Sequence, residues 1–424
     1  PAWNFELFLS DPSFSNSWIV SSKLWNYSLN KIIKRKASLT LSSIILEAII
    51  QVMINKMFSS RVMHISFILY HMKIDDLNKK YLRKANIKES KERYRQILKN
   101  KKYFGGLEKV SIIKENTGYR YHWSIPKTSF LSILIPTRNS LEILKNCLRS
   151  IEQFPSGCDF EIIIIDNGST DKSTLEFLNK FPEEYNIGQK RLVIKKPGPF
   201  NYSKINNEAT LFASGDVYLF LNNDTEFKTK NWGKELISNA LRPSIGCVGT
   251  KLLFEDNTIQ HGGVVLGIGG VAGHAHKFFK EDSFGYQSRL ILSQEFSAVT
   301  GACLAISTEN WNLIGGFDQN HLRINYSDVD LCLKSLKKGL RNIYLPHVIL
   351  THHESKSRGR PKGRFYSQWK KEANYLKNKW KGLILNDPAY SPHLNMFEEN
   401  FSLSIRNEKT IRIRSKFDYF EELS

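Results

Sequence analysis

The sequence predicts an α/β protein built around a mostly parallel central sheet that is flanked by helices. The first observation is a set of short runs rich in β-branched residues: LSILIPT at 131–137, EIIIID at 161–166, RLVIKK at 191–196 and VYLFLNND at 217–224. The second is that helical patterns lie between them, as in SLEILKNCLRSIEQF at residues 140–154. The third is that polar residues directly follow three of the runs. Strands that alternate with helices form right-handed βαβ units, whose strands are parallel.

The composition allows a large core and indicates a polyanionic partner. The chain has 424 residues, of which 41% are hydrophobic and 12% aromatic, and its length suggests two or three domains. Its formal net charge is +20, an excess that favours nucleic acid, an anionic membrane surface or phosphorylated substrates as partners. Because no RNA- or DNA-binding motif occurs in the sequence, we expect no nucleic-acid partner.

The cysteines and the apolar runs predict the compartment. Five cysteines are scattered along the chain without a CxxC spacing, so neither a zinc site nor a disulfide framework is indicated. The most apolar early run, residues 42–54, is too short to span a bilayer and contains Glu47. No signal peptide pattern opens the sequence. We therefore expect a cytoplasmic protein, with peripheral contact at the inner face of an anionic cytoplasmic membrane as an open alternative.

The N-terminal part of the chain contains a faint internal repeat. Residues 19–26, IVSSKLWN, resemble AISTENWN at 305–312, and HISFILYH at 64–71 resembles LPHVILTHH at 345–353. The order and spacing match, so we interpret residues 1–75 as a partial, degenerate copy of the domain that follows. Chance similarity between short apolar strings is the alternative.

The remaining boundaries follow changes in composition. Residues 76–128 are rich in charge, and KKYLRKANIKESKERYRQILKNKK at 79–102 is typical of an exposed basic helix or linker. The α/β pattern then occupies residues 129–392. We expect residues 393–424 to form a C-terminal extension.

The polar residues that follow the strands predict a binding crevice. Thr137 ends the first run, Asp166 the second, and Asn222, Asn223 and Asp224 the fourth. Because the carboxyl ends of parallel strands lie on one side of a sheet, these residues are expected to meet in one crevice. A simple surface turn is the alternative for each loop. No GxGxxG follows the first strand and no GxxxxGK[ST] occurs, so a dinucleotide-binding fold and a P-loop are disfavoured.

Several blocks of this sequence resemble, in order, the inverting family-2 glycosyltransferases of the GT-A fold. These blocks are LSILIPTRNS, EIIIIDNGSTD, GPFNYSKINNEATLFASGDVYLFLNND, AVTGACLAISTENWNLIGGFD and INYSDVDLCLKSLKKG. Two further stretches, GIGGVAGHAHK and THHESKSRG, look like the subgroup of bacterial surface-polysaccharide assembly, of the O-antigen or rhamnan type. The resemblance covers residues 119–392. In that subgroup a degenerate module often precedes the active one, which agrees with the repeat.

The resemblance implies a nucleotide site at the strand ends. The implied nucleotide contacts are Pro136, Thr137, Asp166, Asn206, Asn222 and Asn223. Thr137 and Asp166 would contact the base or ribose, while Asn167 and Ser169 would shape the turn. For Asn206 and its neighbour Asn207, the start of a helix is an equal explanation.

The resemblance also implies a divalent cation, Mn²⁺ or Mg²⁺. NND stands at the family's DxD motif, with Asp224 in the metal-binding place and Asn222 in place of the first acid, which weakens the expected affinity. His352 matches the family's metal-ligating histidine, and His353 is the second choice. Lys356 and Arg358 could bind the diphosphate, although a solvated basic loop explains these two residues equally well.

The stretch SDVDLCLKSL has a catalytic and a structural interpretation. By resemblance, Asp328 is the base that deprotonates the acceptor, Ser327 replaces the first acid of the usual pair, and Asp330 is the second choice. The structural interpretation is a capping box between Ser327 and Asp330 at a helix start.

The acceptor side is implied by two segments. One is the glycine-rich block QHGGVVLGIGGVAGHAHK, which contains His261. The other contains Gly301, Ala302 and Trp311, although Trp311 could equally belong to the core.

We therefore expect a metal-dependent inverting glycosyltransferase of cell-surface polysaccharide biosynthesis. Its donor would be a nucleotide-diphosphate sugar, and its acceptor a saccharide or a lipid-linked saccharide. The alternative is a catalytically weak pseudoenzyme that binds nucleotide sugar or saccharide, because Asn222 and Ser327 replace acids of the family. A nucleotidyltransferase is disfavoured, since PTRNSLEIL lacks the glycine-rich basic loop that such an enzyme has after its first strand.

Overall fold

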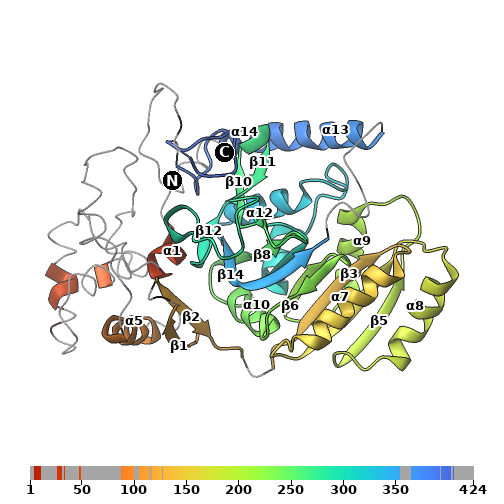
Figure 1. Cartoon of the computed structure of the whole chain (residues 1–424), viewed down its shortest axis with the longest axis horizontal. Helices are drawn as coiled ribbons and strands as arrows, with labels where there is room; N and C mark the ends of the chain where they lie inside the picture. Colours follow the sequence, from red (N-terminus) through yellow and green to blue (C-terminus); the bar gives the residue numbers. More distant parts are fainter. Residues whose placement is uncertain are drawn as a thin grey trace.

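The protein is described by a computed structural model whose centre is one ten-stranded sheet (Figure 1). The structure describes residues 4–10, 26–30, 33, 47–48, 87–99, 105–113, 115, 117–126, 128–353, 364–391, 393–402 and 404. The strands follow the order β12 (Gln294–Phe296), β14 (Arg341–His352), β8 (Ile245–Leu253), β13 (Cys303–Ser307), β6 (Val217–Leu221), β3 (Leu131–Thr137), β4 (Phe160–Asp166) and β5 (Lys190–Lys195). Two short strands complete it: β7 (Thr225–Phe227) pairs with β14, and β9 (Ile259–His261) pairs with β8.

The sheet is parallel in one half and mixed in the other. Strands β6, β3, β4 and β5 are all parallel, as the alternation of strands and helices predicts. β13 then lies antiparallel to both β6 and β8, while β8 and β14 are again parallel. The prediction of an α/β fold is confirmed, and its mostly parallel character belongs to the half that carries the predicted nucleotide site.

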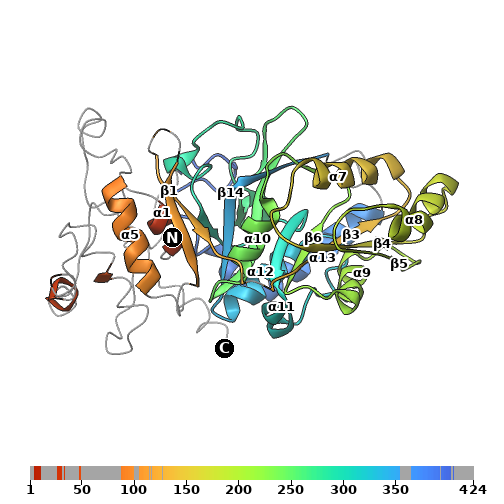
Figure 2. The same ribbon diagram turned by 90° about the horizontal axis from the view of Figure 1, so that it is seen from below.

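Helices cover both faces of the sheet (Figure 2). One core lies under α7 (Leu141–Gln153), α8 (Lys172–Glu184) and α10 (Trp232–Ala240). The other lies under α9 (Tyr202–Ala209), α11 (Thr308–Ile314), α12 (Ser327–Lys337), α13 (Arg364–Lys379) and α14 (Lys381–Leu385). Side chains of β3 alternate between the two, with Ile133 and Ile135 in the first core and Leu134 in the second. Burial on both faces explains why these strands are apolar throughout.

Two hairpins stand apart from the main sheet. One pairs β10 (Val264–Leu266) with β11 (Ala272–His274) across the short helix η4 (Ile268–Gly270). The other pairs β1 (Leu107–Ile112) with β2 (Tyr119–Trp123), and α5 (Ile87–Lys99) contacts it where Ser90 Oγ donates to the Val110 carbonyl at 3.2 Å. Two further short 3-10 helices are η3 (Thr210–Phe212) and η5 (Tyr286–Ser288).

The outer segments differ from their sequence-based description. The helix expected within 79–102 is present as α5, but residues 107–123 form a hairpin rather than a helical linker. Strand β2 of this hairpin alternates buried and partly exposed residues, a pattern that a count of charged residues does not detect. At the other end, Leu394 and Phe401 pack in a core cluster with Val265, so packing continues beyond residue 392. Of the proposed repeat, residues 19–25 and 64–71 lie outside the described residues.

In the described parts of the chain, none of the helices combines the length and the apolar character that a membrane crossing needs.

A buried ion cluster fixes α1 (Phe5–Ser10) to the edge of the sheet. Glu6 accepts from Arg242 at 2.7 Å and from Arg341 at 2.8 Å, and Arg341 also contacts Glu295 at 3.1 Å. Burial alone would raise the pKa of Glu6, but the two guanidinium groups lower that pKa to about 2. The stability that Glu6 contributes is therefore present above its ordinary pKa and is lost as the pH falls toward 2.

Glu6→Gln is expected to lower the free energy of unfolding by about 3 kcal/mol at pH 7, because it removes the buried carboxylate charge that the Arg242 and Arg341 guanidinium groups share. Glu108→Gln is the control, since Glu108 and Lys234 form a pair at 2.9 Å that is more than a third exposed and worth less than about 1 kcal/mol. Urea unfolding of the three proteins measures both effects. Equal stability of the two variants would contradict a role for the Glu6 cluster.

Candidate active site

The carboxyl ends of β3, β4 and β6 are joined by hydrogen bonds into one network. The Asn167 amide donates to the Thr137 carbonyl at 2.9 Å, and Asn223 Nδ2 donates to Thr137 Oγ1 at 3.0 Å. Asp166 is buried, and its Oδ1 accepts from the Ser169 amide at 2.8 Å. The three strand ends therefore meet at one edge, as parallel pairing of β3, β4 and β6 requires.

The loop after β4 is fixed by the residues that were expected to shape it. Ser169 Oγ accepts from the Asn139 amide at 2.8 Å, and Asn167 Nδ2 donates to the Lys196 carbonyl at 2.7 Å. Gly168 has φ +79°, and a Cβ there would lie 3.3 Å from Pro197, so glycine suits both the backbone and the space. The adjacent strand end carries Pro136, which pairs with Ile165 in the parallel register.

Asn206 lies within α9 rather than at its start. The helix begins at Tyr202, and Asn201 caps it by accepting from the Lys204 amide at 2.9 Å. Asn206 is fully buried, and its Nδ2 donates to the Tyr202 carbonyl at 2.8 Å. The helix-start explanation therefore applies to Asn201, which sequence reasoning did not single out.

The Asn222–Asp224 segment forms a turn at the edge of the sheet where β6 ends. Thr225 Oγ1 donates to the Asn222 carbonyl at 2.8 Å, and the Asn222 amide donates to Ala302 O at 3.0 Å. The turn presents the Asn222 side chain to His352, with Nδ2 3.4 Å from Nε2. The turn interpretation of this stretch is therefore confirmed, while its binding role stays a prediction.

The side chains of Asp224 and His352 face each other. His352 Nε2 lies 3.1 Å from Asp224 Oδ1, and both residues are about nine-tenths buried. The other ring nitrogen, Nδ1, lies 2.7 Å from Gln260 Oε1, while Gln260 Nε2 donates to the His352 carbonyl at 3.5 Å. Because Gln260 Oε1 is an acceptor, Nδ1 carries a proton, and in the neutral imidazole the lone pair of Nε2 then points toward Asp224.

This arrangement fits a cation between the two side chains. Asp224 Oδ1 is buried and has no hydrogen-bond partner in the described structure, and the ring nitrogen Nε2 of His352 faces it. A second ring nitrogen that donates to a fixed acceptor is the usual support of a metal-ligating histidine. No group of three or more His, Cys, Asp or Glu ligands occurs among the described residues, so phosphate and water oxygens would complete the coordination.

His353, the second choice for the metal, has both ring nitrogens engaged elsewhere. Nδ1 lies 2.6 Å from Glu255 Oε1, and Nε2 lies 3.0 Å from Glu226 Oε1. Its backbone amide donates to the Asp224 carbonyl at 2.9 Å. His353 therefore supports the Asp224 turn, and His352 is the histidine that faces the carboxylate. Lys356 and Arg358 lie outside the described residues.

Asp328 lies at the start of α12 and is half-buried. Its Oδ2 accepts from the Gly301 amide at 2.7 Å. Burial raises the pKa of the Asp328 carboxyl, an effect that backbone donors at Gly301 and Val329 oppose. A Cβ at Gly301 would lie 3.2 Å from that of Asp328, so this close approach requires a small residue.

A two-residue segment connects the proposed base with the proposed metal side. Gly301 donates to Asp328, and the carbonyl of Ala302 accepts from the Asn222 amide. Asp328 therefore contacts Gly301, and the next residue, Ala302, contacts the Asn222–Asp224 turn. This places Asp328 and the turn on the same edge of the sheet.

Asp330 has a structural role that differs from the predicted capping box. The residue before α12 is Tyr326, with φ +59°, and no side chain caps the helix. The left-handed conformation at Tyr326 turns the chain into the helix, so Ser327 is its first residue instead of its cap. Asp330 is fully buried, and its Oδ1 accepts from Trp380 Nε1 at 2.7 Å and pairs with Lys379 Nζ at 2.8 Å.

The acceptor-side predictions divide between the edge and the core. Gly301 and Ala302 lie beside Asp328 and Asn222, whereas Trp311 packs in the core with its ring centroid 4.9 Å from that of Phe220. The core alternative therefore holds for Trp311. His261 is also fully buried, and its Nδ1 lies 2.8 Å from His274 Nδ1. Burial lowers the pKa of His274 to about 4, so the pair is neutral and joins β9 to β11.

Comparison with known proteins identifies the matching family and relatives. Residues 132–297 match the model described as glycosyl transferase family 2. An uncharacterized protein, y4gI, of Sinorhizobium fredii is 40% identical over 289 residues, which are 68% of this chain and 31% of that protein. The O-antigen biosynthesis protein RfbC of Myxococcus xanthus is 34% identical over 282 residues, 66% of this chain and 21% of that protein. The chain thus spans less than a third of either relative.

Among solved structures, GalNAc-T7 with UDP, GalNAc and Mn²⁺ matches with a TM-score of 0.48 and 13% identity, over 81% of this chain and 67% of that one. The mannosyltransferase PcManGT of Pyrobaculum calidifontis, in complex with GDP-Man and Mn²⁺, matches with a TM-score of 0.44 and 15% identity. The match covers 64% of this chain and 70% of that one.

Proposed function

We propose that this chain, which carries a glycosyl transferase family 2 domain of the GT-A fold, is an inverting glycosyltransferase of cell-surface polysaccharide assembly. Its donor is a nucleotide-diphosphate sugar, and its acceptor is a saccharide or a lipid-linked saccharide. The relative in Myxococcus xanthus that is named for O-antigen biosynthesis supports this pathway.

The observation that carries the proposal is the Gly301-Ala302 bridge between Asp328 and the Asn222–Asp224 turn. An inverting displacement needs a base on one side of the anomeric carbon and a stabilised leaving group on the other. Asp328 takes the proton of the acceptor hydroxyl, whose oxygen then forms the new bond to the anomeric carbon. The bond from that carbon to the diphosphate breaks, and its electron pair leaves with the diphosphate.

The raised pKa of Asp328 suits this role. A carboxylate that binds its proton more tightly is a stronger base at neutral pH than an ordinary aspartate. The Gly301 amide holds one oxygen of the carboxylate at 2.7 Å and so fixes its direction.

Asp224 and His352 would hold a Mn²⁺ or Mg²⁺ ion, with Gln260 orienting the imidazole. When bound, the ion neutralises negative charge that grows on the departing diphosphate. Thr137, Asp166 and Asn223 would hold the nucleoside at the same edge, because they belong to one hydrogen-bonded network.

A panel of UDP-, GDP- and dTDP-sugars tests the proposal. Mixed with the full chain and Mn²⁺, one of them should be hydrolysed slowly without an acceptor and faster with a suitable saccharide. Nucleotide-sugar binding without hydrolysis or transfer would instead support the pseudoenzyme alternative.

Peripheral binding to an anionic membrane is a separate prediction, which follows from the net charge of +20. Each Lys or Arg near such a surface contributes about 1 kcal/mol, and salt screens this attraction. Sedimentation with phosphatidylglycerol-containing vesicles should therefore exceed that with phosphatidylcholine vesicles and should fall as salt is raised. Equal, negligible sedimentation with both would argue for an acceptor away from the membrane.

A further inference from the structure

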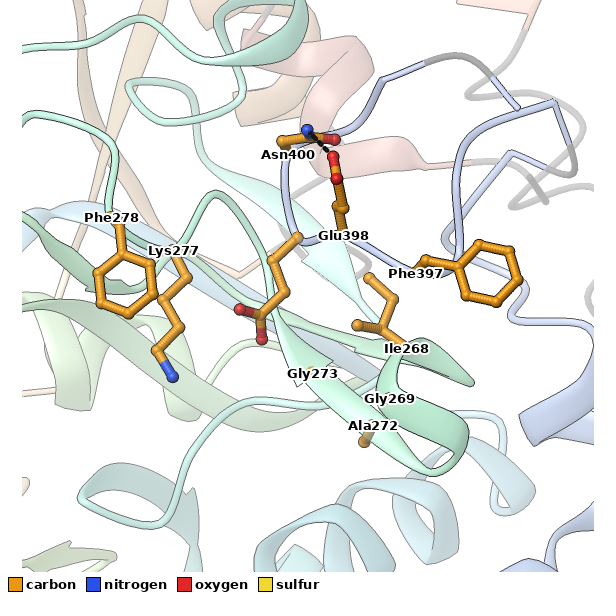
Figure 3. Close-up of a pocket in the computed structure, with 10 residues that line it drawn as sticks. Ile268, Gly269, Ala272, Gly273, Lys277, Phe278, Phe397, Glu398 and Asn400 are labelled. Atoms are coloured by element: carbon orange, nitrogen blue, oxygen red, sulfur yellow. Dashed lines mark hydrogen bonds between the residues drawn. The ribbon is translucent and has the colours of Figure 1, made fainter. Parts of the chain in front are cut away.

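A cavity of about 420 Å³ lies between the β10–β11 hairpin and the segment after α14 (Figure 3). One wall contains Lys277 and Phe278, and the other contains Phe397, with Gly269 and Gly273 between them. The volume is within the roughly 300–1,000 Å³ that small-molecule sites occupy. No element of the proposed mechanism uses this cavity.

Two aromatic rings stand exposed at opposite ends of the cavity (Figure 3). Phe278 is 67% and Phe397 is 71% exposed, although burial of either ring would be favourable. The Phe278 ring is held in place, since it stacks on Phe254 at 5.4 Å and Lys277 Nζ lies 5.2 Å from its centroid. Such rings offer flat apolar surface at a small entropy cost, which suits the C–H face of a sugar ring.

The polar groups of the cavity suit hydroxyl groups better than phosphate. Glu399 Oε1 accepts from the His274 amide at 2.9 Å, and Glu398 Oε2 accepts from Asn400 Nδ2 at 2.5 Å, so both carboxylates are oriented. Carboxylates accept strongly from hydroxyl donors. With two carboxylates and one lysine lining it, the cavity disfavours a nucleotide diphosphate and favours a neutral polyol.

Gly273 allows close packing at the floor of the cavity. A Cβ at Gly273 would lie 2.4 Å from Ile268 Cγ2 and 2.9 Å from Glu399 Oε1, so no side chain fits there.

A series of contacts links the strands that line the cavity with the segment that holds Asp328. Its strand β11 ends at His274, which contacts His261 at 2.8 Å. Its partner β10 is joined to Ala298, because the Val264 amide donates to the Ala298 carbonyl at 3.0 Å. Ala298 precedes Gly301, the residue that holds Asp328, by three positions.

We propose that this cavity is a saccharide subsite, which holds a neutral sugar unit of the acceptor away from the hydroxyl that is glycosylated. Its identification with the acceptor rests on the proposed function, whereas saccharide binding itself does not. The sugar ring stacks on Phe278 or Phe397, and its hydroxyls donate to Glu398 and Glu399.

Saccharide binding to the full chain without a donor tests the proposal. The probes are the methyl glycosides and the α-linked disaccharides of L-rhamnose, D-mannose, D-galactose and N-acetyl-D-glucosamine, followed by saturation-transfer NMR. Phe278→Ala and Phe397→Ala should each weaken binding about tenfold. The matched control is Phe212→Ala, because Phe212 is 46% exposed and lies outside the cavity.

Kinetics give a second measurement once a donor is known. The cavity variants should raise the KM for the acceptor about tenfold and leave kcat and the KM for the donor unchanged, since they remove binding far from the reacting atoms. Saccharide binding without transfer would leave the subsite standing and contradict only the proposed function. The subsite is overturned if no probe binds the wild-type protein, or if Phe278→Ala and Phe397→Ala bind as Phe212→Ala does.

Discussion

Asp328→Asn is expected to lower the turnover of transfer by at least about 100-fold, while nucleotide binding stays at the wild-type level. The amide keeps the shape of the side chain and can still accept from the Gly301 amide, which now fixes the carboxylate at 2.7 Å. What it loses is the ability to take the proton of the acceptor hydroxyl. In the proposed site, donor affinity depends on the separate network of Thr137 and Asp166, so it should persist.

Asp330→Asn provides the matched comparison on the same helix. Asp330 is buried against Trp380 and Lys379, so this change removes a buried charge pair and should cost about 1–3 kcal/mol of stability. Its turnover at a temperature where it is folded should remain close to that of the wild type. Near-normal turnover in Asp328→Asn, together with a collapse in Asp330→Asn, would show that the other carboxylate is the base.

The pH profile provides a further check on Asp328. A base must be ionised to act, and burial raises the pKa of this carboxyl above its ordinary value of 3.8. Activity should therefore fall on the acid side at a higher pH than an ordinary aspartate would give. Asp328→Asn should abolish that acid limb in its residual activity.

The parallel half of the sheet was predictable because local pattern and tertiary role coincide there. The strand 131–137 is buried on both faces, so its apolar run is visible without any knowledge of its neighbours. The antiparallel insertion of β13 between β6 and β8 was not predictable in this way, because strand direction depends on a long connection. The β1–β2 hairpin was not predictable because its first strand shows no regular alternation of buried and exposed residues.

The candidate site could be predicted from the sequence where a side chain ends a strand or follows it closely. Asp166 and Asp224 are such residues, and the sheet brings them to one edge. Gln260 orients His352 from a different strand, and no sequence signal marks it. The choice between His352 and His353 likewise depends on which ring faces Asp224, and only the folded chain shows this.

The metal prediction rests on the facing atoms of Asp224 and His352. In the wild-type protein, Mn²⁺ or Mg²⁺ should strengthen binding of the nucleoside diphosphate of the active donor. In Asp224→Ala that enhancement should disappear, because only the imidazole remains of the two proposed ligands. Transfer should fall by at least about 100-fold, since charge on the leaving diphosphate is no longer neutralised.

Two further variants separate a metal ligand from a residue that merely stabilises the turn. Gln260→Leu removes the acceptor of His352 Nδ1 and should weaken metal affinity by roughly 10–100-fold, the usual effect of losing such a support. Glu255→Gln changes a carboxylate that contacts His353 instead, and it should leave the metal enhancement intact. Calorimetry of nucleoside-diphosphate binding with and without metal measures all of these effects independently of turnover. Binding that is independent of metal in both the wild type and Asp224→Ala would refute the site, and a loss in Glu255→Gln equal to that in Asp224→Ala would assign the ion to His353.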